Sequence, residues 1–218
     1  MPIFLLSDAI EFPSPESASG NGLLAVGGDL SSERLLLAYR MGIFPWYSEP
    51  EPILWWSPDP RLVLFPSKIH ISRRLRRLLK HSLFRITMDT AFRSVMTGCA
   101  RTRLEAGEGT WIDEDMISAY VNLHDQGYAH SLEIWKEGEL CGGLYGVSLG
   151  GCFFGESMFS VASGASKVAL VALSRYLENR SFTMIDCQTR TQHLVRMGAQ
   201  PIPRSLFLSL LNKSLDMP

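Results

Sequence analysis

The sequence predicts an α+β protein, in which a small loop-rich N-terminal domain precedes a mixed sheet flanked by helices. Three observations lead to this prediction. The chain has 218 residues, 46% hydrophobic and 20% charged, a composition typical of globular proteins that bury a core. Proline and glycine are concentrated before residue 62. After that point the periodicity of helices gives way to the alternation of strands. We therefore expect two domains, 1–62 and 63–218.

The first domain has one clear helix, at 32–41, with Ser31 as its N-cap and Gly42 at its end. The remainder is typical of turns and short extended pieces. Aromatic side chains are concentrated in two loop segments, 42–47 and 54–56. Aromatic residues in such loops form either a hydrophobic plug between domains or a platform on which a base stacks. The pattern alone leaves both interpretations open.

The second domain begins with three helices, each preceded by a residue that can cap it. The predicted pairs are Ser72 with 73–80, Thr90 with a helix to about 102, and Asp113 with 114–126.

A meander of three strands follows, and a long amphipathic helix then leads to a fourth strand, so that the sheet is mixed. This order of elements is similar to that of acetyltransferases of the GNAT type. Segment 161–167 has one of the glycines expected of their pyrophosphate loop and no leading Arg, so coenzyme A binding has little support. The predicted ranges are 130–135, 140–149 and 152–160 for the meander, 165–178 for the long helix, 182–188 for the fourth strand, and 191–197 and 205–211 for two final helices.

The net charge of −1 hides a strongly basic region. Between Arg61 and Arg103 the chain has eleven Lys and Arg against one acid, Asp89. A basic region on an otherwise acidic protein predicts a polyanionic partner that docks at one place. The densest part is the helix at 73–80, where leucines form one stripe and cations the rest. We interpret these cations as contacts to the phosphate backbone of a nucleic acid, the alternative being a solvated surface. They are Arg73, Arg74, Arg76, Arg77 and Lys80.

Several classes of protein are disfavoured. The longest apolar run near the centre of a helix is six residues, 168–173, whereas a membrane span needs about 20. The four cysteines form no CxxC pair, so we expect no metal site, and we expect reduced thiols in a cytoplasmic protein. Walker and Gly-x-Gly-x-x-Gly motifs are absent from the sequence, which argues against hydrolysis of nucleoside triphosphates.

The third and fourth strands carry polar residues that could perform chemistry. Alternation puts Phe154, Glu156 and Met158 on one face of the third strand, and Asp186 and Gln188 on one face of the fourth. A carboxylate in an apolar strand needs a partner or a cleft. We therefore expect Glu156 and Asp186 in one site, where paired carboxylates suit a cationic ligand or a proton acceptor. Alternatively, Glu156 braces the sheet and Asp186 caps the next helix.

Seven blocks of sequence resemble the leucyl/phenylalanyl-tRNA–protein transferase family, in the family's order and over about 12–204. The blocks are Gly42-Ile43-Phe44-Pro45-Trp46, Trp55-Trp56-Ser57-Pro58-Asp59-Pro60-Arg61, His70-Ile71-Ser72, Gly109-Thr110-Trp111-Ile112, Gly155-Glu156-Ser157-Met158-Phe159-Ser160, Ala165-Ser166-Lys167 and Ile185-Asp186-Cys187-Gln188.

The resemblance implies a function. The family transfers Leu, Phe or sometimes Met from aminoacyl-tRNA to a protein whose N-terminal residue is Arg or Lys, which marks that protein for degradation by the N-end rule. It implies a GNAT-like catalytic domain that uses aminoacyl-tRNA in place of acetyl-CoA, with no cofactor. The alternatives are an N-acetyltransferase that depends on acetyl-CoA and a non-catalytic module that binds tRNA.

The resemblance also implies roles for residues. Gln188 contacts the attacking amine and Asp186 orients Gln188, although proton transfer through the ribose hydroxyl is a rival. Glu156 and Asp186 would bind the basic side chain of the acceptor. Trp46 and Trp111 would hold the terminal adenine between them. The aminoacyl group would lie among Phe153, Met158, Ser160 and Leu173.

Overall fold

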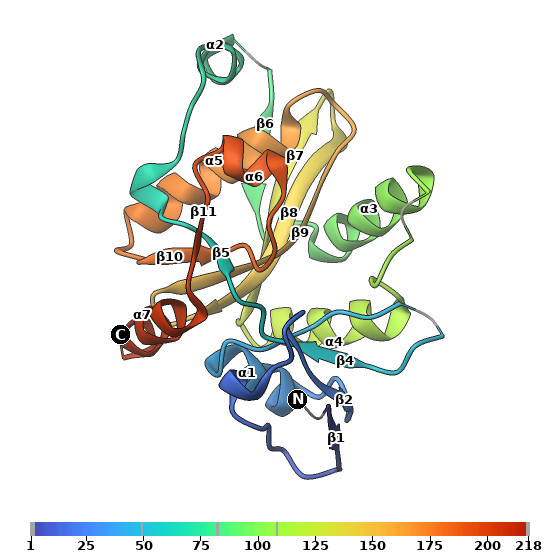
Figure 1. Ribbon diagram of the computed structural model, residues 1–218. Coiled ribbons are helices and arrows are strands. Elements are labelled where there is room, and N and C mark those ends of the chain that lie inside the picture. The colour runs from blue at the N-terminus through green and yellow to red at the C-terminus, as the bar shows by residue number, and fades with distance from the viewer. Residues whose placement is uncertain (1–2, 49, 82, 108, 217–218) are drawn as a thin grey trace.

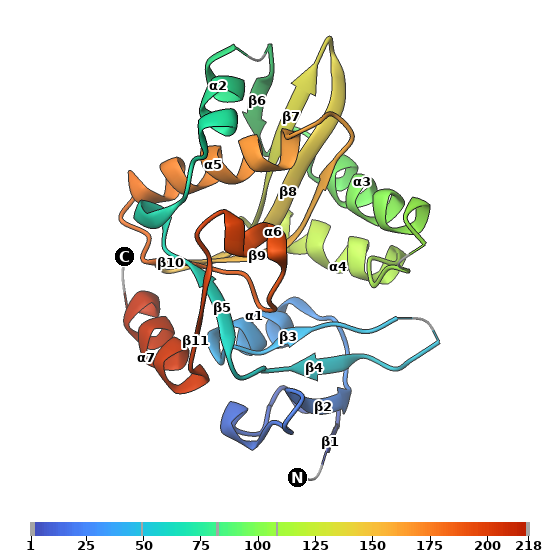
Figure 2. The same cartoon turned by 45° about the horizontal axis from the view of Figure 1, so that its top comes forward.

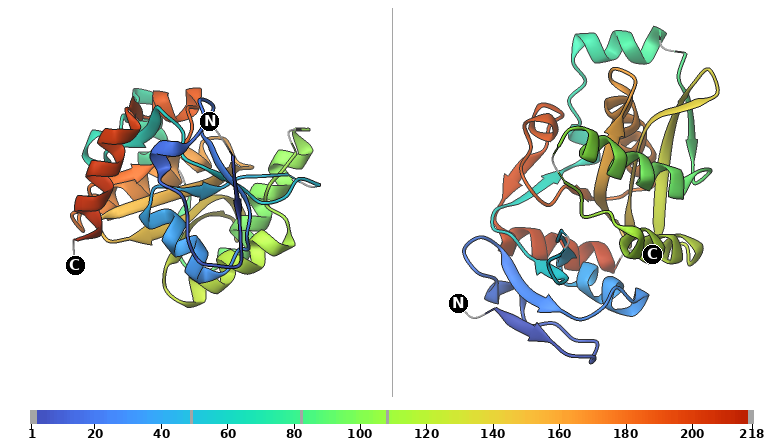
Figure 3. Two further views of the ribbon diagram at one scale, coloured as in Figure 1. Left: turned by 60° about the horizontal axis from the view of Figure 1, so that its bottom comes forward. Right: turned by 90° about the vertical axis from the view of Figure 1, so that its right-hand side faces the viewer.

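The computed structural model describes residues 3–48, 50–81, 83–107 and 109–216, and within them the chain forms two sheets (Figure 1). The smaller sheet lies at one end of the molecule and helix α2 (Arg73–His81) at the other, with the larger sheet between them (Figure 3). Helices cover the larger sheet, so the predicted α+β class is confirmed.

The smaller sheet has the strand order β1-β2-β4-β3, and α1 packs beside it. Ser31 caps α1 by accepting a hydrogen bond from the backbone nitrogen of Arg34, and Gly42 follows the helix with a φ of +71° that glycine adopts readily. Trp55 is fully buried and fills the core, whereas Trp46 is 40% exposed. The bounds are β1 (Phe4–Leu6), β2 (Leu23–Gly27), β3 (Phe44–Pro45), β4 (Leu54–Trp56) and α1 (Ser32–Arg40), with a 3-10 turn at Pro15–Ser17.

The larger sheet has the order β11-β5-β10-β9-β8-β7-β6. Strands β9 and β10 pair in parallel because α5 (Ala165–Glu178) carries the chain back between them, and the other neighbours are antiparallel. The mixed sheet expected from the sequence is therefore present. The bounds are β5 (Arg61–Leu64), β6 (Arg85–Met88), β7 (Ala129–Lys136), β8 (Glu139–Leu149), β9 (Cys152–Ser160), β10 (Met184–Asp186) and β11 (Gln200–Ile202).

Helices cover the two faces of the larger sheet (Figure 2). The core on one face involves α3 (Phe92–Glu105) and α4 (Glu114–Asp125) and continues into the smaller sheet. The core on the other face lies under α5, against which α2 also packs. At Gly142, strand β8 allows α5 to approach closely: a Cβ there would lie 2.5 Å from the Cβ of Ala165. Two further helices, α6 (Gln192–Arg196) and α7 (Arg204–Leu215), follow β10.

The structure corrects several sequence predictions. The sequence did not indicate strands β5, β6 and β11, and β10 ends at Asp186 instead of continuing to 188. Thr90 does not cap α3, because its hydroxyl donates to Glu133 while Ala91 occupies the cap position. The division of the chain at residue 62 stays a prediction, and β5, which spans that point, belongs to the larger sheet.

Strand β9 contains a bulge that inverts its alternation. Tyr145 of β8 pairs with Ser157 and the next residue, Gly146, pairs with Gly155, so Glu156 is the extra residue. Phe154 consequently packs in the core that continues into the smaller sheet, while Met158 packs in the core under α5. The expectation that Phe154, Glu156 and Met158 share one face is therefore wrong.

None of the helices within the described residues has the length and hydrophobicity that crossing a bilayer requires.

Candidate functional site

A cavity of about 560 Å³ opens where β9, the turn after β10, α3, α5 and α6 meet the edge of the smaller sheet. Glu156 and Gln188 form a polar part of its lining, and Phe153, Leu170 and Leu173 are among its apolar residues. The structure brings together here the six residues expected to hold the aminoacyl-adenosine, along with Glu156 and Gln188. The six are Trp46, Trp111, Phe153, Met158, Ser160 and Leu173.

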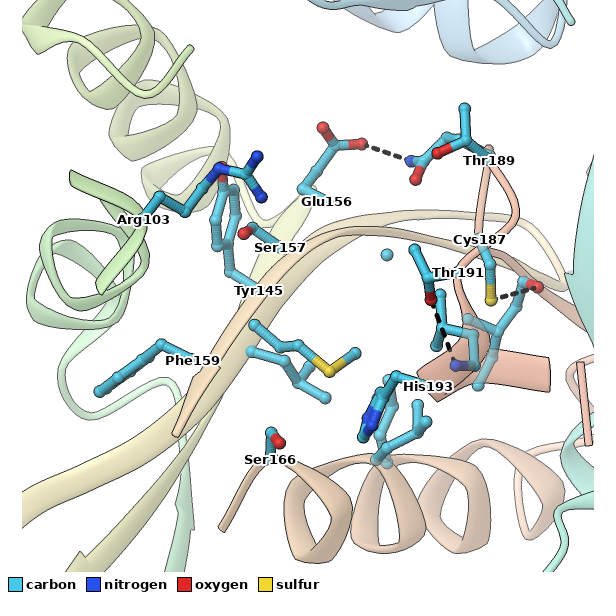
Figure 4. Close-up of a pocket in the computed structure, with 18 of the residues that line it drawn as sticks. Arg103, Tyr145, Glu156, Ser157, Phe159, Ser166, Cys187, Thr189, Thr191 and His193 are labelled. Carbon is cyan, nitrogen blue, oxygen red and sulfur yellow. Dashed lines mark hydrogen bonds between the residues drawn. The ribbon is translucent and has the colours of Figure 1, made fainter. Parts of the chain in front are cut away.

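Glu156 occupies the polar part of the cavity. It points toward the turn that carries Thr189, and Arg103 lies on the opposite side (Figure 4). Its Oε1 accepts a hydrogen bond of 3.1 Å from Nε2 of Gln188, and its Oε2 accepts one of 3.2 Å from the hydroxyl of Tyr120. Tyr120 is in turn hydrogen-bonded to the buried Tyr39. Glu156 is thus held in place by hydrogen bonds from neutral donors.

The pKa of Glu156 is raised to about 7, chiefly because burial disfavours its ionised form. The negative charge of Asp186 raises it further, and hydrogen bonds from Tyr39 and Tyr120 oppose the rise, as does the positive charge of Arg61. A carboxyl group with such a pKa can exist in both protonation states near neutral pH.

Asp186 does not line the cavity, contrary to the sequence prediction. It is fully buried, and its carboxylate pairs with Arg61, with Nε to Oδ1 at 2.8 Å and Nη2 to Oδ2 at 2.6 Å. Ile185 and Cys187 line the cavity instead, because side chains alternate along β10. A cationic ligand therefore meets Glu156 without a second carboxylate from Asp186.

Gln188 reaches the cavity because the strand has ended before it. Its φ is +53°, and its backbone nitrogen donates to Oδ1 of Asp186 at 3.0 Å. The expectation that Asp186 orients Gln188 agrees with this contact, which runs through the backbone and not through the side-chain amide. The roles of both residues in a reaction stay predictions.

Two tryptophans lie at the opening of the cavity. The rings of Trp46 and Trp111 are 6.0 Å apart between centroids and nearly perpendicular, at 88°. The guanidinium of Arg103 lies 4.4 Å from the centroid of the Trp111 ring. A base held between the two tryptophans, as the resemblance implies, requires one ring to turn.

The basic helix α2 lies outside the cavity but close to one end of it. Leu75 is buried, and all five predicted cations are exposed. Ser72 caps the helix by accepting from the backbone nitrogen of Leu75 at 3.2 Å. Leu78 packs against Gly164, two residues before the cavity-lining Ser166. The cations are thus available to a ligand that extends out of the cavity.

Sequence reasoning missed several residues of this region. Arg61 lay within a block quoted for the resemblance, and its signal was a charge at the start of the apolar run 61–64. Tyr120 and Tyr39 gave no signal, because buried tyrosines on helices are ordinary core residues. His193 also lines the cavity; burial and the charge of Lys167 lower its pKa.

Comparison with known proteins gives one family over most of the chain. The family model described as leucyl/phenylalanyl-tRNA protein transferase matches residues 63–212, and the model of that transferase's N-terminal domain matches 28–59. A leucyl/phenylalanyl-tRNA–protein transferase of Desulfatibacillum aliphaticivorans is 57% identical over 218 residues, covering 100% of this chain and 94% of the relative. One of Myxococcus xanthus is 54% identical over 220 residues, with the same coverage of each.

Among solved structures, an aminoglycoside acetyltransferase from an uncultured soil metagenomic sample aligns with a TM-score of 0.42 and 12% identity, over 53% of this chain and 84% of that chain. A ribosomal-protein-alanine N-acetyltransferase from Brucella melitensis aligns with a TM-score of 0.38 and 16% identity, over 52% of this chain and 85% of that chain.

Proposed function

This chain belongs to the leucyl/phenylalanyl-tRNA protein transferase family, and from that membership we propose that it transfers Leu, Phe or Met from aminoacyl-tRNA to the N-terminal Arg or Lys of an acceptor protein. The product would enter N-end-rule degradation in the cytoplasm. The observation that carries the proposal is the cavity, in which an apolar chamber adjoins one carboxylate and one amide.

The donor would occupy the length of the cavity. Its apolar side chain fits beside Phe153, Met158 and Leu173, where flexible Met158 can adapt to Leu, Phe or Met. The terminal adenine stacks on Trp46 and Trp111, a contact worth about 1–3 kcal/mol per base. The acceptor stem then extends out of the cavity toward the cations of α2, which neutralise its phosphates without reading sequence.

The acceptor would approach from the polar side. The ionised carboxylate of Glu156 pairs with the cationic side chain of the N-terminal Arg or Lys, since it is the carboxylate that lines the cavity among the described residues. The nearby oxygen of the Gln188 amide accepts a hydrogen bond from the attacking α-amino group. Asp186 accepts a hydrogen bond from the backbone nitrogen of Gln188 and makes no contact with the acceptor.

The chemistry is aminolysis of an activated ester. The neutral α-amino nitrogen attacks the carbonyl carbon, the bond from that carbon to the ribose 3′ oxygen breaks, and the released 3′ hydroxyl gains a proton as the amine loses one. A free α-amino group has a pKa of about 7.7–8.0, so part of it is neutral at pH 7. An amide is too weak a base to take a full proton, so Gln188 positions the amine, and proximity supplies most of the acceleration.

The test is transfer of labelled Leu from leucyl-tRNA to a peptide that begins with Arg. We expect transfer to that peptide, none to an otherwise identical peptide that begins with Ala, and loss of transfer after RNase treatment. Binding of tRNA without transfer would support a non-catalytic module, and acetylation that depends on acetyl-CoA would support an acetyltransferase.

A further inference from the structure

Arg61 is buried directly behind the wall of the cavity. Its residue exposure is 0%, and its guanidinium carbon lies 4.6 Å from the ring centroid of Phe44 and 4.7 Å from that of Phe207. Phe44 lines the cavity on its other side. The two rings fix the plane of the guanidinium, and neither solvent nor a ligand in the cavity reaches it. Any effect of Arg61 on the reaction must therefore pass through another residue.

Asp186 is the residue that Arg61 holds. Nε and Nη2 of Arg61 donate to separate oxygens of the Asp186 carboxylate, at 2.8 and 2.6 Å. Two parallel bonds between a planar guanidinium and a planar carboxylate fix the rotation of the carboxylate as well as its position. Lysine has a single ammonium group and cannot reproduce both bonds in this geometry.

Asp186 in turn holds the backbone of Gln188. Its Oδ1 accepts a hydrogen bond from the backbone nitrogen of Gln188 at 3.0 Å. Leu62, the neighbour of Arg61 on β5, donates from its backbone nitrogen to the backbone oxygen of Gln188 at 3.1 Å. Gln188 needs this support because its φ of +53° is unfavourable for a residue with a side chain. In that conformation its amide reaches Glu156 across the cavity, at 3.1 Å.

We infer that Arg61 is a positioning residue for the proposed transfer reaction, which fixes the amide of Gln188 in the cavity by fixing the carboxylate of Asp186. The inference rests on the proposed function, because Gln188 is the group it prepares for the acceptor amine. The contacts that run from Arg61 through Asp186 to the Gln188 backbone are 2.8, 2.6 and 3.0 Å long, so a shift at the first is transmitted to the last.

The kinetic test uses Arg61→Lys, which keeps the charge beside Asp186 and removes the paired bonds. A misplaced Gln188 should lower kcat about 10- to 100-fold, with KM for aminoacyl-tRNA unchanged. The same substitution in a Gln188→Ala background should have almost no further effect, because the group that Arg61 positions is already absent. Equal losses of kcat in both backgrounds would show that Arg61 acts elsewhere and would overturn the inference.

Arg34→Lys is the matched control. Arg34 is also fully buried, donates to the backbone oxygens of Ser7 and Ala9, and pairs with Asp29 away from the cavity. The Arg34→Lys variant should lose thermal stability, as Arg61→Lys does, but should retain the wild-type kcat. A loss of kcat in Arg34→Lys as large as in Arg61→Lys would mean that the general effect of a buried lysine explains both.

A structural measurement separates this inference from the proposed function. In ¹⁵N-labelled protein, the side-chain amide signals that disappear in Gln188→Ala belong to Gln188. They should move in Arg61→Lys and stay in place in Arg34→Lys. If the wild type transfers no Leu, the proposed function fails while this measurement still decides the positioning. If the Gln188 signals do not move in folded Arg61→Lys, the inference that Arg61 positions Gln188 is overturned.

Discussion

Glu156 has a pKa of about 7, close to the range in which the α-amino group of an acceptor begins to lose its proton. Burial causes the shift, and the bulge that makes Glu156 an extra residue turns it into the cavity. Ionisation of this group therefore changes both the electrostatics of the site and the stability of the fold in the same interval of pH.

The first prediction concerns stability. Folding favours the protonated form of Glu156, whose pKa is raised from the ordinary value of 4.5 to about 7. The contribution of this group to the free energy of unfolding is therefore fully present below pH 4.5 and is lost as the pH rises to about 7. Glu156→Gln stays neutral and avoids this loss, so its free energy of unfolding relative to wild type should rise by about 2–3 kcal/mol between pH 4.5 and 8. Urea unfolding at several pH values measures the difference.

The exposed Glu139→Gln is the control for loss of one carboxyl group. A difference between Glu156→Gln and wild type that stays constant over the interval would mean that Glu156 titrates as it does in the unfolded chain.

The second prediction concerns the acceptor. If the Glu156 carboxylate pairs with the N-terminal Arg or Lys, Glu156→Gln should weaken transfer to Arg-initiated peptides by about 1.5–3 kcal/mol, the value of a charged hydrogen bond. KM for aminoacyl-tRNA should change little, because the donor side chain is apolar. Competition between Arg-initiated and Ala-initiated peptides measures the effect. Unchanged discrimination would leave Glu156 with the role of bracing the sheet.

At the scale of elements, α2 presents a clear separation of roles. Leu75 is buried in the core under α5 while five cations remain exposed, and the helix contributes no residue to the cavity. An element built in this way can alter the affinity for a polyanion without altering the geometry of the reaction.

The third prediction follows from that separation. Arg76→Ala with Arg77→Ala should raise KM for aminoacyl-tRNA and reduce the dependence of log affinity on log salt by about 2, one for each lost phosphate contact. A minimal aminoacyl-adenosine substrate should react at the wild-type rate. The control is Arg40→Ala with Lys213→Ala, which removes equal charge from exposed positions on α1 and α7. Equal effects on both substrates would assign α2 a structural role.

Elements whose bounds depend on residues close together in the chain could be predicted from the sequence. The caps at Ser31, Ser72 and Asp113 act within three residues, and the apolar spacing of α5 sets its bounds. Strands β5, β6 and β11 are three or four residues long and are defined by partners far along the chain, which a local pattern does not contain.

The candidate site could be predicted in part for the same reason. Glu156 stands out in the sequence as a carboxylate inside a predicted strand, and Gln188 as a polar residue at the end of the next one, and the structure brings them together. The position of Asp186 could not be predicted, because its partner is 125 residues away on a strand that the sequence did not indicate. The conformation of Gln188 depends on that same long-range contact.

At the scale of the whole molecule, one hydrophobic core joins the two sheets. The ring of Phe154 on β9 lies 4.9 Å from that of Tyr39 on α1, between centroids, and the same core contains Trp55 of the smaller sheet and Phe207 of α7. The two parts of the chain therefore bury each other's apolar surface and should unfold together.

The fourth prediction tests this cooperativity. Phe154→Ala leaves a void in the shared core and should lower the free energy of unfolding by about 3–5 kcal/mol. Tryptophan fluorescence and far-ultraviolet circular dichroism should give one midpoint, before and after substitution. Leu206→Ala, at a position 47% exposed, should shift the midpoint far less. Two separate transitions would show that the sheets unfold independently.

The bulge in β9 fixes which residues of that strand face each side of the sheet. Before it, odd-numbered Phe153 packs in the core under α5; after it, even-numbered Met158 does. Exchanging one residue for another here alters a single contact, whereas removing one between 154 and 158 would move the following side chains from one core to the other along the rest of the strand. Natural variation in this strand should therefore consist of substitutions at constant length, and changes of length should be confined to the loops that join one element to the next.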